Sequence, residues 1–485
     1  MKIPGAATLA LAIDFKEKIM SVLKVYSAYK PDHLIAELPR INREEAYRKL
    51  QRAQDYFLDR QNWLPAHERI RILKIACRLV NERSDELAKQ AALEGGKPLV
   101  DSKVELARAV NGIEVAIQEM NQLTGEEVKM GVTSSSANKM AFTRYEPCGV
   151  VLAISAFNHP FNLIVHQVIP AIAAGSPCLV RPASSTPLSC VSLVEILHEA
   201  GIPQELCTLL LCEREVAQEI VSDPRIRFMS FIGSAEVGFH LNSKLSPGAK
   251  ATLEHGGVAP VILCEDANLK EAVPGLLKAS FYHAGQVCVS AQRIYIHENR
   301  KNEFLDDFVR AAKELRTGDP LSEETEVGPI ISKDEIERID QWVQEAIELG
   351  GELLCGGNRL GESCYESTVI LNPPQNCKLS QFEIFGPVVA VYSYDELDSA
   401  FSQANALPYC FQASLYTESY HTAMKASTSL KAMTVLINEH PAFRVDWMPF
   451  GGSEKSGLGM GGIGNSIRDM SLEKLIIFHS SELPS

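Results

Sequence analysis

The chain has 485 residues, 46% of them hydrophobic and 22% charged, a composition typical of folded globular proteins and unlike disordered or membrane-spanning chains. Single hydrophobic cores stop growing near about 250 to 300 residues, so the length predicts two large lobes. The 61 acidic residues outnumber the 47 basic ones, and the formal net charge of −14 disfavours nucleic acid as a partner.

The first twenty residues combine one lysine with a short apolar run. Pro4 and Gly5 interrupt the lead-in, so a secretory signal peptide is disfavoured. Twelve cysteines are scattered from Cys77 to Cys410 without a Cys-x-x-Cys pair or a histidine cluster at metal spacing, which predicts neither disulfides nor a metal site. Unpaired thiols are typical of a reducing compartment, and we expect a cytoplasmic protein without a membrane partner.

Residues 43–123 show helical periodicity, with apolar residues recurring at intervals of three and four and one run ending at Gly95 and Gly96. The serine-rich segment 125–147 lacks this period and predicts an extended ribbon outside the main body. Because the ribbon has no local strand to pair with, we expect it to contact a partner subunit.

Strands and helices alternate from residue 149 onward. The predicted strands read GVVLAIS, CLVRP, LCTLLL and RFMSFIG, with helices expected at 160–174, 186–200, 213–221 and from Ser234. This order predicts a parallel sheet covered on both faces, an architecture that binds nucleotides in other proteins. After residue 269 the alternation restarts with different spacing, which predicts a second α/β lobe.

Two glycine-rich segments are candidates for a phosphate site. GLGMGGIG (457–464) holds two overlapping G-x-G-x-x-G patterns, but a dinucleotide fingerprint needs a βαβ unit with an acidic residue about 20 residues on, and only 485 − 464 = 21 residues follow Gly464, so the segment predicts a structural turn. FIGSAEVG is the better candidate, because a strand ends at Gly233 and Ser234 then starts a helix with Glu236 in its first turn. The free N–H groups of such a helix start attract phosphate, although most strand-to-helix junctions are simple capped turns.

Two further residues could carry chemistry. Glu254 ends an apolar strand in TLEHGG before two glycines, and it is a candidate general base or a solvated carboxylate. Cys288 follows Gly285 and Gln286 in GQVCVSA, and its thiol would be reactive only if its pKa were lowered or a base stood nearby. Periodicity alone does not decide between these interpretations.

The chain resembles the aldehyde dehydrogenase superfamily from about Tyr26 to its end. The resemblance rests on motifs in the order of that family: EPCGVVLAISAFNHPFN, PAIAAGSPCLVRPASSTPLS, FMSFIGSAEVG, LEHGG, GQVC, GDP with GPII, EIFGPV and PFGGSEKSGLG. The separation of Glu254 from Cys288, 288 − 254 = 34 residues, is also similar to the family spacing. His159, in AFNHP, resembles the subgroup that acts on lactaldehyde and phosphonate aldehydes.

The resemblance implies a role for each matching residue. Cys288 would be the nucleophile, and the side-chain amide of Asn158 would stabilise the oxyanion together with the backbone N–H of Cys288. Glu254 would activate the water that hydrolyses the thioester. Glu383 would bind the nicotinamide ribose, and Phe385 would pack beside the ring. Gly233 and Ser234 would then lie at the cofactor pyrophosphate.

Two positions depart from the family pattern. The chain has Arg181-Pro-Ala-Ser184 where relatives have Lys-Pro-(Ser/Ala)-Glu. Without that carboxylate nothing repels a 2′-phosphate, so the sequence predicts that NADP is accepted beside NAD. Glu454 stands where the family often has lysine, and a local change of ion pairing is the simplest explanation.

The substrate is predicted to be a small aldehyde with a hydroxylated or anionic tail. Arg108 and Arg444 could supply cations at the entrance, and His159 follows the oxyanion donor. The alternatives are a solvated helix face for the arginines and a helix cap for His159. Val287 beside the nucleophile offers no charge, and the net charge of −14 would not steer anions, so any attraction has to be local.

The predicted fold class is α/β, a Rossmann-like cofactor domain plus an α/β catalytic domain with a small β-ribbon for oligomerisation. The resemblance implies that residues 1–124 and 147–256 bind NAD(P), that 257–463 form the catalytic domain, and that 125–146 and 464–485 form the ribbon and tail. It also implies a homodimer or homotetramer. A dehydrogenase that passes the acyl group to CoA, and a non-catalytic structural relative, are the alternative functions.

Overall fold

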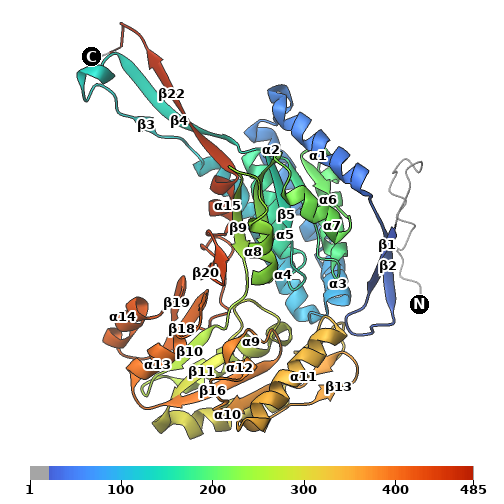
Figure 1. Cartoon of the computed structure of the whole chain (residues 1–485), viewed down its shortest axis with the longest axis vertical. Helices are drawn as coiled ribbons and strands as arrows, with labels where there is room; N and C mark the ends of the chain where they lie inside the picture. Colours follow the sequence, from blue (N-terminus) through green and yellow to red (C-terminus); the bar gives the residue numbers. More distant parts are fainter. Residues whose placement is uncertain (1–20, 484–485) are drawn as a thin grey trace.

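The computed structural model describes residues 21–483, so the predicted absence of a signal peptide concerns residues outside the described range. Two α/β lobes are stacked along the long axis of the molecule, and a narrow β-ribbon projects from the upper lobe (Figure 1). This arrangement confirms the predicted α/β class with a Rossmann-like first lobe. None of the described helices is long and apolar enough to cross a membrane.

The first lobe is built on a six-stranded sheet with the order β21-β9-β8-β5-β6-β7. Its strands are β5 (Val150–Ile154), β6 (Cys178–Arg181), β7 (Cys207–Leu209), β8 (Ile226–Ile232), β9 (Lys250–Glu254) and β21 (Gly457–Leu458). All neighbours are parallel except β21, which pairs antiparallel with β9. Every residue of β5 is buried, as expected for a strand covered by helices on both faces.

Helices cover this sheet at the predicted places. They are α1 (Arg43–Leu58), α2 (Ala66–Glu82), α3 (Ser84–Gly95), α4 (Leu99–Gln122), α5 (Asn162–Ala174), α6 (Pro187–Glu199), α7 (Arg214–Val221) and α8 (Ala235–Asn242). Helix α3 ends where the sequence predicted, because Gly96 takes the left-handed conformation with φ of 76°. A hairpin of β1 (Ser21–Tyr26) and β2 (Leu34–Arg40), which the sequence did not indicate, precedes α1.

The second lobe holds a seven-stranded sheet with the order β12-β15-β16-β11-β10-β18-β19. The strands are β10 (Pro260–Leu263), β11 (Arg293–His297), β12 (Glu352–Cys355), β15 (Thr368–Leu371), β16 (Val388–Tyr394), β18 (Gln412–Tyr416) and β19 (Thr434–Ile437). Only β12, at one edge, is antiparallel to its neighbour. The covering helices are α9 (Leu269–Phe281), α10 (Lys301–Glu314), α11 (Lys333–Glu348), α12 (Lys378–Gln381), α13 (Leu397–Ala404) and α14 (Tyr420–Ser429).

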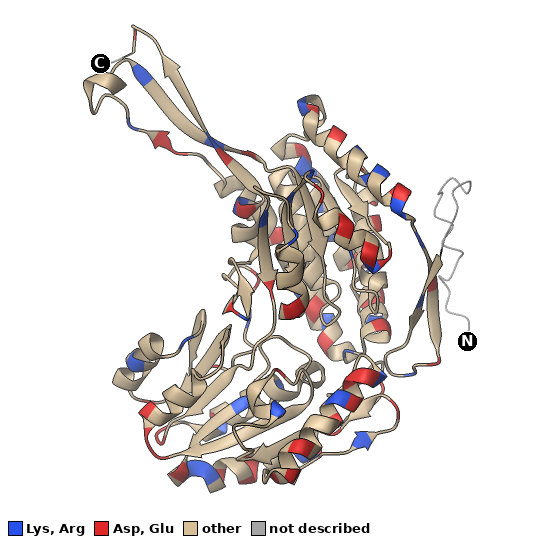
Figure 2. Cartoon of the chain, in the orientation of Figure 1, with Lys and Arg blue, Asp and Glu red and all other residues tan. Residues whose placement is uncertain are grey.

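Two small two-stranded sheets complete this lobe, β13 (Arg359–Leu360) with β14 (Cys364–Tyr365) and β17 (Tyr409–Cys410) with β20 (Ser453–Glu454). Lysines and arginines alternate with acidic residues over both lobes (Figure 2). Each lobe has its own large sheet. The chain passes from the first lobe to the second between β9 and β10.

The ribbon consists of β3 (Glu127–Val128), β4 (Lys139–Pro147) and β22 (Ser471–His479). Strand β4 pairs with β22 along its whole length, so the predicted ribbon and the C-terminal tail form one sheet. The tail prediction began at residue 464, but α15 (Ile463–Asp469) packs on α4 and α5 of the first lobe before the ribbon starts. Strand β21 and this helix belong to the first lobe, although the resemblance implied that the whole of 257–463 forms the catalytic domain.

Candidate active site

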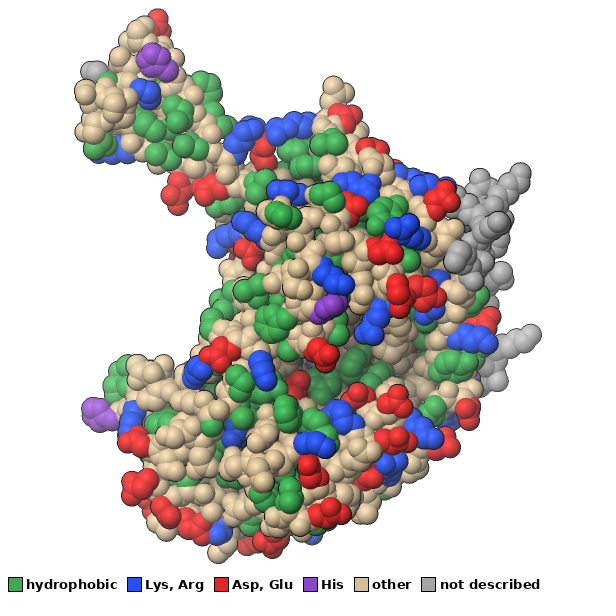
Figure 3. Space-filling view, viewed as in Figure 1, with side chains coloured by type: hydrophobic (Ala, Val, Ile, Leu, Met, Phe, Trp, Pro, Cys, Tyr) green, Lys and Arg blue, Asp and Glu red, His purple; other side chains and the backbone are tan. Residues whose placement is uncertain are grey.

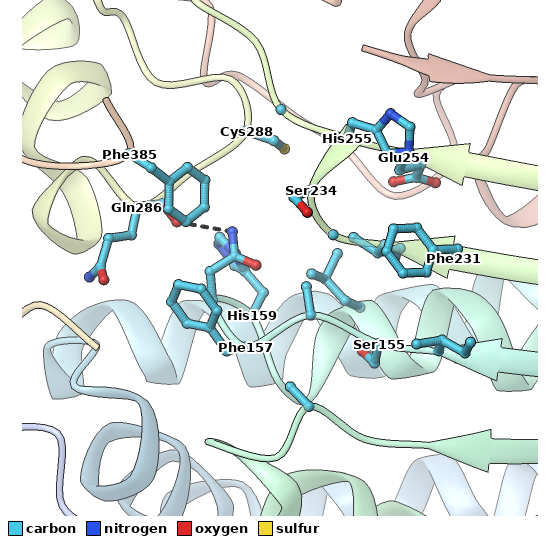
Figure 4. A pocket seen from close by; sticks show the side chains of 18 of the residues that line it. Ser155, Phe157, His159, Phe231, Ser234, Glu254, His255, Gln286, Cys288 and Phe385 are labelled. Atoms are coloured by element: carbon cyan, nitrogen blue, oxygen red, sulfur yellow. Dashed lines mark hydrogen bonds between the residues drawn. The ribbon is translucent and has the colours of Figure 1, made fainter. Parts of the chain in front are cut away.

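One cavity of about 620 Å³ is lined by both lobes. The carboxyl ends of β5, β8 and β9 contribute residues to it, and the loops that carry Cys288 and Phe385 contribute from the second lobe (Figure 4). Eleven of the twelve predicted site residues line this cavity: Arg108, Asn158, His159, Arg181, Gly233, Ser234, Glu254, Cys288, Glu383, Phe385 and Arg444. Ser184 lines a neighbouring cavity of about 280 Å³, which shares Ser185 with the first.

Cys288 enters the cavity from a strained turn that follows α9. His283 and Ala284 have φ values of 48° and 54°, a left-handed conformation that side chains rarely adopt. Gly285 continues the turn, and a Cβ there would lie 2.1 Å from the carbonyl oxygen of Gly386. The glycine of GQVC is therefore required by close packing of two backbones.

Gln286 anchors this turn. Its side-chain amide donates to the carbonyl oxygen of Pro329 at 3.1 Å, and its side-chain oxygen accepts from the N–H of Ile331 at 3.0 Å. The side chain is buried, so these bonds are sheltered from water. The motif GQVC was recognised from the sequence, but the role of the glutamine was not.

Burial disfavours the thiolate form of the nucleophile candidate. Cys288 is half-buried, and burial raises the pKa of its thiol to about 12, while the nearby Arg444 guanidinium opposes this shift. A thiol with such a pKa needs a proton acceptor before it can attack a carbonyl. Glu254 lines the same cavity and is itself a titratable group with a raised pKa.

Asn158 lies directly after β5, at the point where the chain turns into α5. Its side-chain amide donates to the carbonyl oxygen of Gln286 at 3.0 Å, which leaves the second amide hydrogen for another acceptor. The start of α5 is held by Glu105, whose carboxylate accepts from the N–H groups of Phe161 and Asn162, both at 2.9 Å. Glu105 in turn forms a buried ion pair with Lys97 at 2.5 Å.

Lys97 and Glu105 were not singled out from the sequence, because both fall within or beside ordinary helical patterns. These two charged residues stand out only because both are buried, and burial is seen only in the tertiary structure. The pair stabilises the AFNHP turn and with it the position of Asn158.

Glu254 is the last residue of β9, where it pairs with Gly457 of β21. A Cβ on Gly461 would lie 2.2 Å from the carboxylate Oε1 of Glu254, so the glycine-rich segment leaves room for the acid. This segment is a turn and an edge strand rather than a phosphate loop, as the sequence predicted. Burial raises the pKa of Glu254, and Arg444 opposes the shift.

Glu383 reaches across to the glycines that follow Glu254. Its Oε1 accepts from the N–H of Gly257 at 3.0 Å, and a Cβ on Gly256 would lie 1.9 Å from the same oxygen. Burial raises the pKa of Glu383 to about 8. Phe385 has a left-handed φ of 48°, and its ring packs edge-on against Phe157 at 5.8 Å (Figure 4).

Three further residues that line the cavity carry groups able to bind an anion. Ser234 precedes α8 without a side-chain capping bond, so the first N–H groups of that helix remain available to a pyrophosphate. Arg181 has a buried Nε without a hydrogen-bond partner, which suits an incoming anion. Arg214, at the start of α7, adds a second guanidinium that sequence reasoning missed.

Each of the predicted substrate residues lines the cavity and has a hydrogen-bonded side-chain partner. His159 Nε2 lies 3.1 Å from the hydroxyl of Tyr282. Arg108 donates to Asp446 through Nη2 at 2.8 Å and Nε at 3.3 Å, while Arg444 Nη2 lies 3.3 Å from His166 Nδ1. The sequence did not indicate Tyr282, His166 or Asp446, because none of them stands in a recognised motif.

Glu454, the second departure from the family pattern, has a partner. It pairs with Lys431, in the loop between α14 and β19, and lies in β20 with a φ of 54°. Glu454 does not line the active-site cavity. Glu454 therefore takes part in a local ion pair outside the cavity.

Comparisons with known proteins agree with this geometry. The sequence model of the aldehyde dehydrogenase family matches residues 16–476. The 3-sulfolactaldehyde dehydrogenase of Priestia aryabhattai is 36% identical over 420 residues, 86% of this chain and 88% of that protein. The lactaldehyde dehydrogenase of Methanocaldococcus jannaschii is 36% identical over 463 residues, 94% of this chain and 97% of that protein.

Two solved structures share the fold over nearly the whole length. Glyceraldehyde-3-phosphate dehydrogenase from Methanocaldococcus jannaschii, complexed with NADP, has a TM-score of 0.90 and 35% identity, covering 94% of this chain and 99% of that one. Aldehyde dehydrogenase 21 from Physcomitrella patens, in complex with the reaction product succinate, has a TM-score of 0.91 and 32% identity, covering 95% and 96%.

Proposed function

The chain belongs to the aldehyde dehydrogenase family, and from that premise we propose that it oxidises a short aldehyde with an anionic or hydroxylated tail to its acid through Cys288. The enzyme class and the use of NAD(P) follow from the family. One observation supports the cysteine mechanism. The thiol of Cys288, the carboxylate of Glu254 and the side-chain amide of Asn158 all line the same cavity.

In the first step the Cys288 thiol releases its proton to solvent water and its sulfur attacks the aldehyde carbon. The carbonyl oxygen becomes a tetrahedral oxyanion, which the free amide hydrogen of Asn158 and the backbone N–H of Cys288 are proposed to stabilise. NAD(P), when bound, would supply the hydride acceptor, and loss of hydride would leave the acyl group on Cys288 as a thioester. Glu383 and Phe385 would hold the nicotinamide end of the cofactor.

In the second step Glu254 removes a proton from a water molecule that attacks the thioester carbon. The carbon–sulfur bond breaks, the carboxylic acid leaves, and Cys288 regains its proton. Burial raises the pKa of Glu254, which moves the carboxylate towards the range where a general base works best. A CoA-acylating enzyme would have no use for this base, so Glu254 favours hydrolysis.

We propose that NADP is accepted and preferred over NAD. Arg181 and Arg214 supply positive charge at the adenosine end, and Ser184 stands where many relatives have a carboxylate. A 2′-phosphate carries a negative charge that a bidentate guanidinium binds well and a nearby carboxylate would repel. The NADP complex of one structural relative agrees with this choice.

Restoring the carboxylate tests the proposal. Ser184→Glu is expected to lower kcat/KM for NADP by about 10- to 100-fold because the two negative charges repel each other, with a far smaller effect for NAD. The measurement is initial rate against concentration for both cofactors with one aldehyde. Arg214→Gln serves as the matched variant and should also weaken NADP selectively. A wild-type protein that strongly prefers NAD would contradict the proposal.

An anionic or hydroxylated tail is proposed for the substrate because the cavity near Cys288 holds Arg108, His159 and Arg444. Relatives named for 3-sulfolactaldehyde and lactaldehyde, and a structural relative bound to succinate, support this substrate class. Arg444 lies close enough to Cys288 and Glu254 to oppose the rise of both pKa values. A cation at that distance can also pair with the tail of a bound aldehyde.

Two aldehydes with the same number of carbons, one anionic and one neutral, test whether Arg444 recognises the charge of the tail. Arg444→Met is expected to raise KM for succinic semialdehyde by about 10- to 100-fold, because one charged hydrogen-bonded contact is lost, and to leave KM for butyraldehyde within about twofold. Steady-state kinetics with both aldehydes is the measurement, and lactaldehyde reports on the hydroxylated alternative. Equal changes for succinic semialdehyde and butyraldehyde would overturn the anionic assignment.

We propose that the ribbon joins two subunits in a homodimer or homotetramer. Apolar side chains lie exposed on its strands, as the space-filling view shows (Figure 3), and they include Met140, Leu472, Leu475, Ile477 and Phe478. Exposed apolar patches and open strand edges are typical of contact with another chain. A reducing compartment, the cytoplasm, is proposed because all twelve cysteines are free thiols.

A further inference from the structure

Arg108 and Arg444 both line the cavity, but their partners differ. Asp446 is buried, and its two oxygens accept from Arg108 Nη2 at 2.8 Å, Arg108 Nε at 3.3 Å, Asn162 at 3.3 Å and His166 at 2.9 Å. Two of these four donors belong to Arg108, which binds both oxygens of the carboxylate, Nη2 to Oδ1 and Nε to Oδ2. The charge of Arg108 is therefore already neutralised inside the protein.

Arg444 makes no ion pair with any carboxylate in the described part of the chain. Its Nη2 contacts His166 Nδ1 at 3.3 Å, its guanidinium carbon lies 3.5 Å from the centre of the Phe450 ring, and its buried Nε has no partner. A neutral imidazole and an aromatic face orient a cation without cancelling its charge. Arg444 thus keeps its charge for a ligand, whereas Arg108 does not.

The hydrogen bonds determine the tautomer of His166. Because an ionised carboxylate only accepts, Nε2 carries the proton that goes to Asp446. Because a guanidinium only donates, Nδ1 is the unprotonated acceptor of Arg444. Burial lowers the pKa of His166 to about 4, with Arg444 adding to the effect, so the ring stays neutral at physiological pH.

We propose that His166 is a positioning residue that aims Arg444 at the charged tail of the substrate, held in its tautomer by Asp446. His166 is buried in α5 and does not line the cavity, so it acts through Arg444 rather than by touching the aldehyde. This inference rests on the proposed anionic substrate. It adds that Arg444 binds the tail of that substrate, whereas Arg108 is paired with Asp446 inside the protein. Asp446 serves both, as the neutralising partner of Arg108 and the anchor of His166.

Two substitutions test the roles of the two ring nitrogens of His166 one at a time. His166→Gln can still donate to Asp446 in place of Nε2, but offers no acceptor in place of Nδ1. His166→Asn can offer an oxygen in place of Nδ1, but loses the donor to Asp446. We expect His166→Gln to raise KM for succinic semialdehyde about tenfold while KM for butyraldehyde and kcat for both change less than twofold. His166→Asn is expected to recover part of the loss.

The double variant His166→Gln with Arg444→Met provides a second test of the positioning role. If His166 acts through Arg444, His166→Gln should add no further increase in KM for the anionic aldehyde in that background. Equal effects on both aldehydes, or full additivity with Arg444→Met, would overturn the positioning role. If Arg444→Met alone shows no preference between the two aldehydes, the anionic substrate itself is refuted, an outcome distinct from failure of the His166 proposal. Thermal unfolding of each variant identifies any loss of folding.

Discussion

Cys288→Ser is expected to lower kcat/KM for short aldehydes by at least about 10³-fold, with an unfolding temperature close to that of the unchanged protein. Serine has nearly the same shape, but its hydroxyl is a far weaker nucleophile than a thiolate and a poorer leaving group in the hydrolysis step. The measurement is NADPH formation with an aldehyde panel. A fully inert wild-type protein would instead favour the non-catalytic alternative.

Cys77 provides the matched control, because it and Cys288 are the two thiols of the chain that are not fully buried. Cys77→Ser should retain activity, since Cys77 lies outside the active-site cavity and contacts the Val110 carbonyl at 3.7 Å. Comparable losses in both variants would contradict the assignment of Cys288 as nucleophile.

The raised pKa of Cys288 adds a pH dependence to this prediction. Burial raises the pKa to about 12, and the thiolate fraction below the pKa grows tenfold per pH unit. Alkylation of the cofactor-free protein by iodoacetamide should therefore accelerate steadily from pH 7 to pH 10 without a plateau. A plateau near pH 7 would mean that another group already holds the thiolate.

Glu254→Gln is expected to stop the reaction after one equivalent of NADPH per active site. The amide cannot take a proton from water, so the thioester should accumulate, and the steady-state rate should fall by about 10²- to 10⁴-fold. A stopped-flow burst followed by mass spectrometry of the intact acylated chain is the measurement. Hydroxylamine, which attacks thioesters without a base, should restore turnover.

The same variant separates hydrolysis from acyl transfer. If the chain were a CoA-acylating enzyme, CoA would be required by the wild-type protein and would restore full turnover to Glu254→Gln. Loss of the burst itself would mean that Glu254 acts before the thioester forms, for example by activating the thiol. That outcome would contradict its assignment to the water step alone.

The family and most of the predicted residues that line the cavity could be identified from the sequence, because the proposed catalytic residues stand beside distinctive neighbours. Cys288 follows Gly285 and Gln286, Glu254 precedes two glycines, and the structure explains these neighbours by close packing: a Cβ on Gly256 would clash with Glu383. The alternation of strands and helices also determined the two α/β lobes, since periodicity is a local property of the chain.

Contacts between distant segments were decided only by the tertiary structure. Arg108 and Asp446 are 338 residues apart, and His166 and Arg444 are 278 apart, so no local pattern connects them. The sequence therefore treated Arg108 and Arg444 as equivalent cations, and did not predict that β21 would join the first sheet. Only the folded structure shows that Asp446 neutralises Arg108, while Arg444 pairs with no carboxylate among the described residues and can bind a ligand. The reason is that charge pairing depends on the distance between two groups in space, not on their separation along the chain.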